Sequence, residues 1–200
     1  MYTRIARLVH EEKGVPYLTQ EVEIFGPDGV PLDHLQRHPF GRVPVLQHDD
    51  AFFLYETAAI THYIDEAFAG PALQPPDLRR RARMRQVIGI LDSYAYRPMV
   101  WGVYVQRLRV PLSGGAPDEA EIARSLEASA RCLGALSELL GSGSYFAGEQ
   151  LSLADLHALP ILHYFCLVPE GQAMFQQYAP LPGWYELMLT RPSVRSTVGM

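Results

Sequence analysis

The chain changes character near residue 70, and this change limits the folds that it can adopt. Before residue 70, short apolar runs alternate with turns. After it, apolar residues recur every three or four positions over long stretches, which is the period of an amphipathic helix. This order predicts an α+β domain followed by an all-α helical bundle. We place the first domain at residues 1–70, a linker rich in proline at 71–77, and the helical domain at 78–200.

The first domain contains a helix, a strand, and then a hairpin that leads into another helix. Ile5, Leu8 and Val9 share one helical face, and Gly14 ends that helix. Apolar and polar residues alternate over 18–24, which predicts a half-buried strand. The remaining expected elements are a short helix at 32–37, strands at 43–46 and 52–55, and a helix at 56–68.

The first helix raises a problem of topology. An amphipathic helix followed by a strand is the second half of a βαβ unit, whose opening strand should precede Ile5. Four residues lie there. We expect either that the opening strand is missing from this sequence, through a misplaced start or a truncation, or that this edge of the sheet is filled in another way.

In the second domain, a long helix is expected from about Leu78 to Arg109, bent where Pro98 removes a backbone donor. The next helix starts after Pro117, where acidic residues oppose the positive end of the helix dipole. Another begins at Ser152, which can cap it, while Asp155 can reach back to the Ser152 amide.

Composition excludes several classes of function. Apolar residues make up 48% and charged residues 20%, as in a globular protein. A net charge of −5 argues against nucleic acid and anionic membranes as partners, and no apolar run has the roughly 20 residues that span a bilayer. The spacing of His34 and His38 would suit two metal ligands, but no third ligand accompanies them. We expect a cytoplasmic protein without a metal site.

The segment from His38 to Thr61 has the pattern of a ligand site. A proline at the head of a strand has no amide for the ladder, and a cis bond at Pro44 would let Val43 turn its amide and carbonyl toward a peptide-like ligand. Glu56 and Thr57 open a helix, whose free amides attract a carboxylate while Glu56 can pair with an ammonium group. This pattern suits an amino-acid head group. The alternative is that both residues merely cap the helix.

This segment resembles a known family. His-Pro-Phe-Gly-Arg-Val-Pro-Val-Leu, a hairpin and then Leu-Tyr-Glu-Thr-Ala-Ala-Ile are similar to the glutathione-binding half of the cytosolic glutathione transferases. Residues 145–155 (Tyr-Phe-Ala-Gly-Glu-Gln-Leu-Ser-Leu-Ala-Asp) resemble the capping motif of their C-terminal half, and Trp184-Tyr185 and residues 191–194 resemble its ending. The likeness covers nearly the whole chain, and the bacterial theta- and phi-like branches are nearest.

The resemblance implies a thioredoxin-like first domain, and a homodimer that joins the thiolate of glutathione, its co-substrate, to small hydrophobic electrophiles in detoxification. It implies that Val43 pairs with the cysteinyl backbone of glutathione beside a cis Pro44. Glu56 and Thr57 would hold the γ-glutamyl group, and Arg42 could reach the tripeptide.

The resemblance also points to an acceptor pocket on the long helix. Its candidate residues are aromatic: Tyr94, Tyr96, Trp101 and Tyr104. Aromatic residues at helical spacing are also typical of interdomain core or dimer contacts.

Two departures from the family pattern bear on catalysis. The Ser, Cys or Tyr that stabilises the thiolate would fall one position before Met1, so the catalytic residue is unknown; Tyr2 and Thr3 do not match its position. Residues 29–31 stand where relatives often carry a His or Lys facing the glycine carboxylate. The alternatives are a non-catalytic binding or regulatory protein of the same fold, and another glutathione-dependent reaction such as peroxide reduction, isomerisation or dehalogenation.

Overall fold

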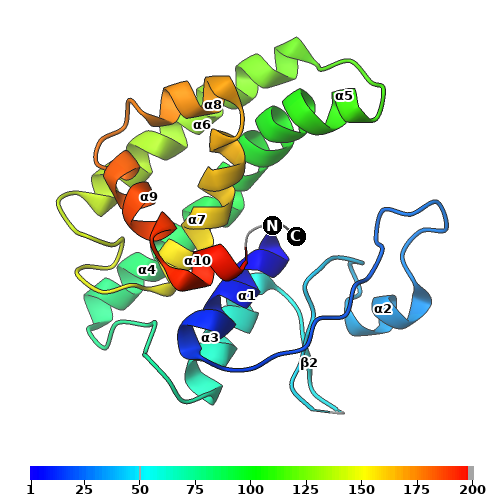
Figure 1. The fold of residues 1–200 in the computed structure, drawn as a ribbon, viewed down its shortest axis with the longest axis vertical. Coiled ribbons are helices and arrows are strands. Elements are labelled where there is room, and N and C mark those ends of the chain that lie inside the picture. The colour runs from blue at the N-terminus through cyan, green and yellow to red at the C-terminus, as the bar shows by residue number, and fades with distance from the viewer. Residues whose placement is uncertain (50, 198–200) are drawn as a thin grey trace. The chain divides into compact units, whose positions relative to one another are not determined.

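The computed structural model describes residues 1–49 and 51–197 (Figure 1). The chain divides into two compact units, residues 1–72 with Thr197 and residues 73–196. Each unit is described by itself. Within the described residues, no helix combines the length and the apolar character that crossing a membrane requires.

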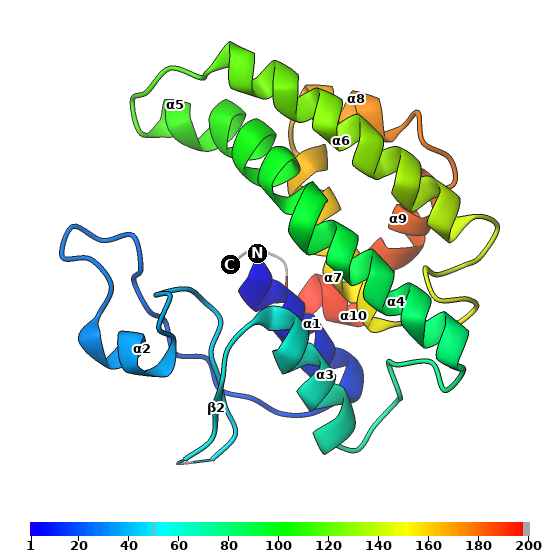
Figure 2. The ribbon, with the colours of Figure 1, turned by 180° about the vertical axis from the view of Figure 1, so that it is seen from behind.

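The first unit is built on two helices that pack against each other, α1 (Tyr2–Lys13) and α3 (Thr57–Ala67) (Figures 1 and 2). The centre of their contact is apolar and closed to solvent. Its buried side chains are Ile5, Leu8, Val9, Ile60 and Ile64. The face predicted for the first helix is therefore confirmed, and Gly14 ends α1 in the left-handed conformation (φ 66°) as expected.

The strand expected over residues 18–24 is not formed. The structure assigns no strand to residues 15–31, and the side chain of Leu18 is 100% exposed. Alternating apolar residues describe the two faces of a strand, but a strand also needs a neighbouring backbone for its N–H and C=O groups. The prediction was wrong because this segment has no such neighbour in the described structure.

The hairpin is confirmed but shorter than expected. Strands β1 (Leu46–Gln47) and β2 (Phe53–Leu54) are antiparallel, with Leu46 opposite Leu54 and Gln47 opposite Phe53. The His48 amide also donates to the carbonyl oxygen of Phe52, at 3.2 Å. Pro44 has no amide to donate, so pairing begins after it. The short helix α2 (Leu32–Arg37) lies where the sequence predicted it.

The second unit is entirely helical in its described elements. The expected long helix is a continuous run of α4 (Leu78–Ile90), the π-helices η1 (Leu91–Ala95) and η2 (Arg97–Arg109), and α5 (Val110–Leu112). It packs against α6 (Glu119–Leu140) and α7 (Leu153–Cys166). In α7 every residue from Leu153 to Leu162 is buried. The unit is completed by α8 (Pro169–Phe175), α9 (Leu181–Leu189) and α10 (Pro192–Ser196).

The π-helical register has a local cause and a packing consequence. Backbone hydrogen bonds here span five residues, as from the Val110 amide to the Val105 carbonyl. Pro98 lies within this stretch and offers no amide to the ordinary four-residue ladder. In the same stretch Gly102 faces α6 so closely that a Cβ would lie 1.9 Å from Oγ of Ser125. A glycine is therefore required for η2 and α6 to pack as they do.

The start of α7 is held by one buried carboxylate. Asp155 is fully buried and accepts hydrogen bonds from the amides of Phe146 (3.0 Å) and Ser152 (2.9 Å). It also accepts from the Ser152 hydroxyl (2.7 Å) and from Nε1 of Trp184 (2.9 Å). The predicted capping box is confirmed. Its carboxylate also joins α7 to α9 and to the preceding loop.

Candidate functional site

The predicted site lies in two segments of the first unit, residues 42–44 and 56–57. The peptide bond between Val43 and Pro44 is cis, as the resemblance implied. Both residues are partly exposed and immediately precede β1, while the Arg42 side chain is exposed. The backbone of Val43 is therefore accessible at the head of the hairpin.

The second segment is the N-terminus of α3. Glu56 is the N-cap residue. Its backbone adopts φ 68° and ψ 114°, a conformation that residues other than glycine rarely adopt. A conformation of this kind costs on the order of 1–3 kcal/mol, and such residues gather at functional sites. Glu56 is exposed, whereas Thr57 is buried, and the amides of the first turn have no partner within the helix. The segment offers a carboxylate, a hydroxyl and free amides together.

The register of the hairpin brings the two segments together. Leu46, two residues after Pro44, pairs with Leu54, two residues before Glu56. A ligand that lay along Val43 would therefore reach the start of α3. This arrangement follows from the pairing of β1 with β2 and does not depend on the other unit.

Two histidines support this region, and sequence reasoning assigned them no such role. Nε2 of His34 donates a hydrogen bond to the carbonyl oxygen of Arg42, at 2.7 Å, and so fixes the backbone just before Val43. The spacing of His34 and His38 was considered for metal ligation. The position of His38 just before Pro-Phe-Gly is the signal that could have pointed to a supporting role.

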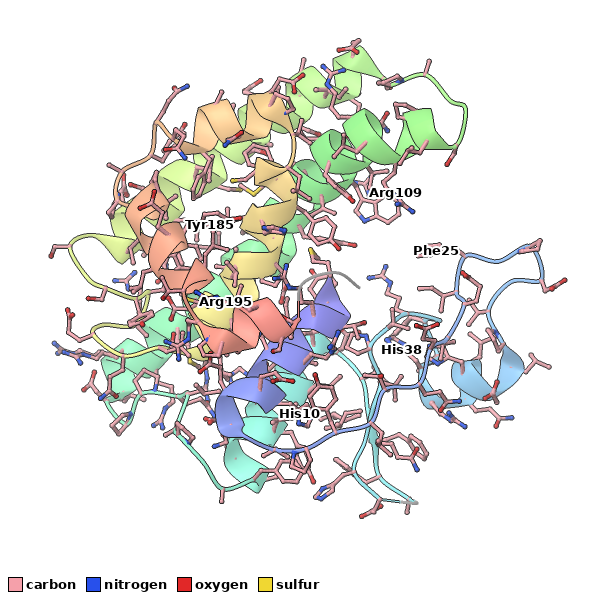
Figure 3. The ribbon with its side chains drawn as sticks, viewed as in Figure 1. His10, Phe25, His38, Arg109, Tyr185 and Arg195 are labelled. Carbon is pink, nitrogen blue, oxygen red and sulfur yellow. The ribbon has the colours of Figure 1, made fainter. Side chains whose placement is uncertain are left out.

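His38, labelled in Figure 3, is buried beside the second segment. Its ring lies 4.8 Å from that of Tyr55, the residue before Glu56. Burial lowers the pKa of His38, and the negative charge of Glu56 opposes this shift. Nδ1 of His38 is buried and has no hydrogen-bond partner among the described residues. A neutral imidazole thus packs beside the strained turn.

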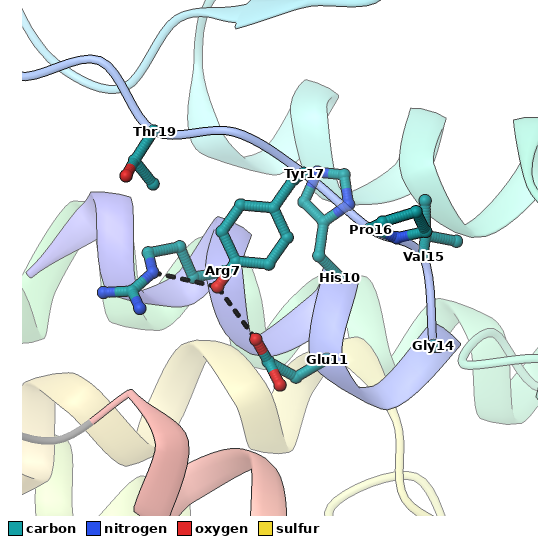
Figure 4. Close-up of a pocket in the computed structure, with 8 residues that line it drawn as sticks. All are labelled: Arg7, His10, Glu11, Gly14, Val15, Pro16, Tyr17 and Thr19. Carbon is teal, nitrogen blue, oxygen red and sulfur yellow. Dashed lines mark hydrogen bonds between the residues drawn. The ribbon is translucent and has the colours of Figure 1, made fainter.

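A separate pocket of about 550 Å³ lies along α1 (Figure 4). The hydroxyl of Tyr17 accepts a hydrogen bond from Nε of Arg7 (3.0 Å) and donates one to Oε1 of Glu11 (2.9 Å). Burial raises the pKa of Tyr17, and its ring lies 4.9 Å from the ring of His10. None of the predicted glutathione-site residues lines this pocket. This pocket is therefore distinct from the predicted site.

The four aromatic residues predicted for an acceptor pocket do not form one cluster in the described structure. Nε1 of Trp101 donates to the hydroxyl of Tyr96 at 2.8 Å, while Tyr104 meets the ring of Tyr164 edge-on at 4.7 Å. Tyr94 is 67% exposed. Of the four, Tyr104 lines a pocket, of about 500 Å³, at the end of η2.

Two family models match this chain, one in each of its two units. Residues 1–67 match the family described as glutathione S-transferase, N-terminal domain, and residues 88–192 match glutathione S-transferase, C-terminal domain. Glutathione S-transferase F13 of Arabidopsis thaliana is 30% identical over 192 residues, which cover 95% of this chain and 86% of that protein.

Solved structures agree over nearly the whole length. Glutathione transferase F7 from Populus trichocarpa matches with a TM-score of 0.84 at 27% identity, covering 98% of this chain and 92% of that one. Glutathione S-transferase I from maize, in complex with an atrazine glutathione conjugate, matches with a TM-score of 0.82 at 26% identity and the same coverage.

Proposed function

Because this chain belongs to the glutathione S-transferase family, we propose that it is an enzyme that binds glutathione as co-substrate and conjugates it to small hydrophobic electrophiles. Its two halves have the thioredoxin-like and helical folds of that family. In the conjugation, the thiolate sulfur attacks an electrophilic carbon, a carbon–sulfur bond forms, and a leaving group departs with its bonding electrons. The protein contributes positioning and a lowered thiol pKa.

The glutathione site is proposed at the two segments joined by the hairpin. The backbone of Val43, beside Pro44, would pair with the cysteinyl residue, and Arg42 would reach the tripeptide. Glu56 would bind the ammonium of the γ-glutamyl group, and Thr57 with the first-turn amides of α3 would bind its carboxylate. The observation that carries this proposal is the unusual backbone of Glu56 (φ 68°), two residues after the last paired residue of the hairpin.

Calorimetric titration of glutathione tests this site. Glu56→Ala removes the ammonium partner and is expected to abolish measurable binding while the unfolding transition stays two-state. Glu66→Ala, an exposed glutamate on the same helix, is the matched control and should bind as the wild type does. Equal affinity of the Glu56→Ala variant and the wild type would refute the site.

The acceptor pocket is proposed on the helical unit, with Tyr94, Tyr96, Trp101 and Tyr104 as candidates. Tyr104 is the best-supported of these candidates, because it lines a pocket and its ring packs edge-on against Tyr164. Replacing Tyr104 by Ala should raise the KM for an aromatic acceptor while leaving the KM for glutathione unchanged. If both constants stayed at their wild-type values, Tyr104 would not belong to the acceptor pocket.

We propose that residues 18–24 pair with another strand in the functional protein. These residues alternate in polarity, yet they are unpaired, and Leu18 is fully exposed. Pairing with the family's first strand would satisfy their backbone and cover Leu18. Intact mass and N-terminal sequencing of the protein from its native source test this. A mass that matches residues 1–200 alone would contradict it.

We also propose a place in the bacterial theta- and phi-like branch, a cytoplasmic homodimer and a role in detoxification. The proposed domains are residues 1–70 and 78–200 with a linker at 71–77. These assignments are supported by the family membership. Light scattering of the purified protein tests the dimer, since a mass of one chain would contradict it.

A further inference from the structure

The pocket at the end of η2 combines an apolar wall with charged groups. Its lining residues are Tyr104, Arg107, Leu108, Arg109, Pro111 and Leu112. All six come from η2 and α5, so the pocket is formed within one continuous helical run. It therefore exists in the helical unit taken alone.

The π-helical register sets Tyr104 and Arg109 on the same side of the helical run, and both line the pocket. In a π-helix, residues five apart are neighbours along the axis, and the Tyr96–Trp101 hydrogen bond in the same run has that spacing. Tyr104 and Arg109 are also five apart, and the positive charge of Arg109 acts on the Tyr104 hydroxyl. In an ordinary α-helix, five-residue spacing would turn the two side chains away from each other.

The two arginines of the pocket differ in what holds them. Arg107 is fully engaged: it bonds both carboxylate oxygens of Glu119 (2.6 and 2.9 Å) and also Glu170 (2.8 Å). Arg109, labelled in Figure 3, is exposed, and its guanidinium makes no ion pair or hydrogen bond with the described residues. The pocket therefore has one positive charge that is not neutralised.

Tyr104 adds a donor beside this charge. Its ring is held edge-on by Tyr164 at 4.7 Å, so the direction of its hydroxyl is restricted. Burial raises the pKa of Tyr104, which keeps the hydroxyl protonated at neutral pH. Arg109 and Tyr104 together can donate hydrogen bonds to one carboxylate or sulfonate group.

On the basis of the function proposed above, we propose that this pocket selects acceptors in which an apolar body carries an acidic group. Arg109 and Tyr104 donate hydrogen bonds to the acid, and Leu108, Pro111 and Leu112 contact the apolar body. A fitting acceptor is chlorodinitrobenzoate. The glutathione sulfur bonds to the ring carbon that bears chlorine, the carbon–chlorine bond breaks, chloride leaves with the bonding pair, and the carboxylate is unchanged.

Two acceptors that differ by one carboxylate test the proposal. We compare kcat/KM for chlorodinitrobenzoate with that for the neutral chlorodinitrobenzene. Arg109→Gln should lower the acid-to-neutral ratio about tenfold, the size expected for one charged hydrogen bond. Arg97→Gln is the control, because Arg97 is an exposed arginine on the same helix that does not line the pocket, and it should keep the wild-type ratio. An unchanged ratio in Arg109→Gln, or an equal fall in both variants, would overturn the proposal.

A binding measurement separates this proposal from the transferase assignment. Fluorescence titration with anilinonaphthalene sulfonate needs no glutathione and no turnover. Arg109→Gln and Tyr104→Phe should each weaken the binding of this dye, whereas Arg97→Gln should not. Inactivity of the wild type toward both acceptors would count against the proposed function, and the dye would still report on the pocket. Two results would overturn the proposal that this pocket selects acidic acceptors. One is dye binding that Arg109→Gln does not change, and the other is weaker dye binding with no change in the acid-to-neutral ratio.

Discussion

Nζ of Lys13 lies 3.1 Å from Oδ1 of Asp65 and also donates a hydrogen bond to the Asp65 carbonyl oxygen at 2.9 Å. The two side chains are 2% and 5% exposed, so the ion pair is buried. It joins the last residue of α1 to α3, the helix whose first turn carries Glu56 and Thr57. The position of that first turn thus depends in part on a buried contact at the other end of the helix.

Breaking this pair should destabilise the first unit. Lys13→Met leaves the Asp65 carboxylate buried without its cation and is expected to lower the free energy of unfolding by about 3 kcal/mol. Urea unfolding measures the change. The control is Glu127→Ala, which removes an exposed pair with Arg131 (3.9 Å) and should change stability by less than about 0.5 kcal/mol. A similar effect of both substitutions would show that burial does not matter here.

The buried carboxylate of α7 should dominate the stability of the second unit. Asp155→Ala leaves two amides and the Trp184 indole without an acceptor, and we expect a loss of about 4 kcal/mol or more. Ser152→Ala removes one side-chain bond of the cap and should cost about 1 kcal/mol. Thermal unfolding compares these variants with Ser144→Ala, an exposed serine. If all three melted together, the capping box would have no role in stability.

Most helices were predictable because the spacing of apolar residues and the caps are local signals. Ile5 with Leu8 defined a face that the structure buries, and Asp155 satisfies a box visible in four consecutive residues. The strand at 18–24 failed because periodicity does not encode a hydrogen-bond partner. The π register was not predicted either, since Pro98 indicated a bend but not a change in the length of the backbone ring.

The two segments of the proposed site were also recognised from local sequence signals. Pro44, Glu56 and Thr57 belong to a motif, and the hairpin that aligns them was recognised from its strands. The contact of His34 with the Arg42 carbonyl depends on how the loop after α2 turns back, which the sequence pattern does not show. Supporting residues of this kind become visible once the backbone is placed.

Stability should fall as the solution is acidified below about pH 6.5, in part because of His38. In the unfolded chain this ring gains a proton near its ordinary pKa of about 6.5. Burial lowers its pKa in the folded protein, so the unfolded state binds more protons as the pH falls through this range. His38→Asn should flatten the decline in stability between about pH 6.5 and 5. The slope that remains includes a contribution from His10, because burial lowers its pKa too. Urea unfolding measures the free energy of unfolding across this pH range. If its slope against pH were the same in His38→Asn as in the wild type, the role assigned to His38 would be contradicted.

The backbone of Glu56 should cost stability that its function requires. Glu56→Gly relieves the positive φ and is expected to stabilise the fold by up to about 1 kcal/mol while glutathione binding is lost. Chemical denaturation and calorimetry on the same sample measure both effects. Destabilisation by this substitution would mean that the side chain of Glu56 contributes more to the fold than its backbone conformation costs.

The most direct test of the proposed glutathione site is an amide chemical-shift titration of the isotope-labelled protein with glutathione. We predict saturable shifts at the amide of Val43 and at the amides of Thr57, Ala58 and Ala59 in the first turn of α3. Thr19, which lines the separate pocket along α1, should not shift. Saturable shifts at Thr19, with the amide signals of Val43 and Thr57 unchanged, would place glutathione in the pocket along α1 and contradict the proposed site.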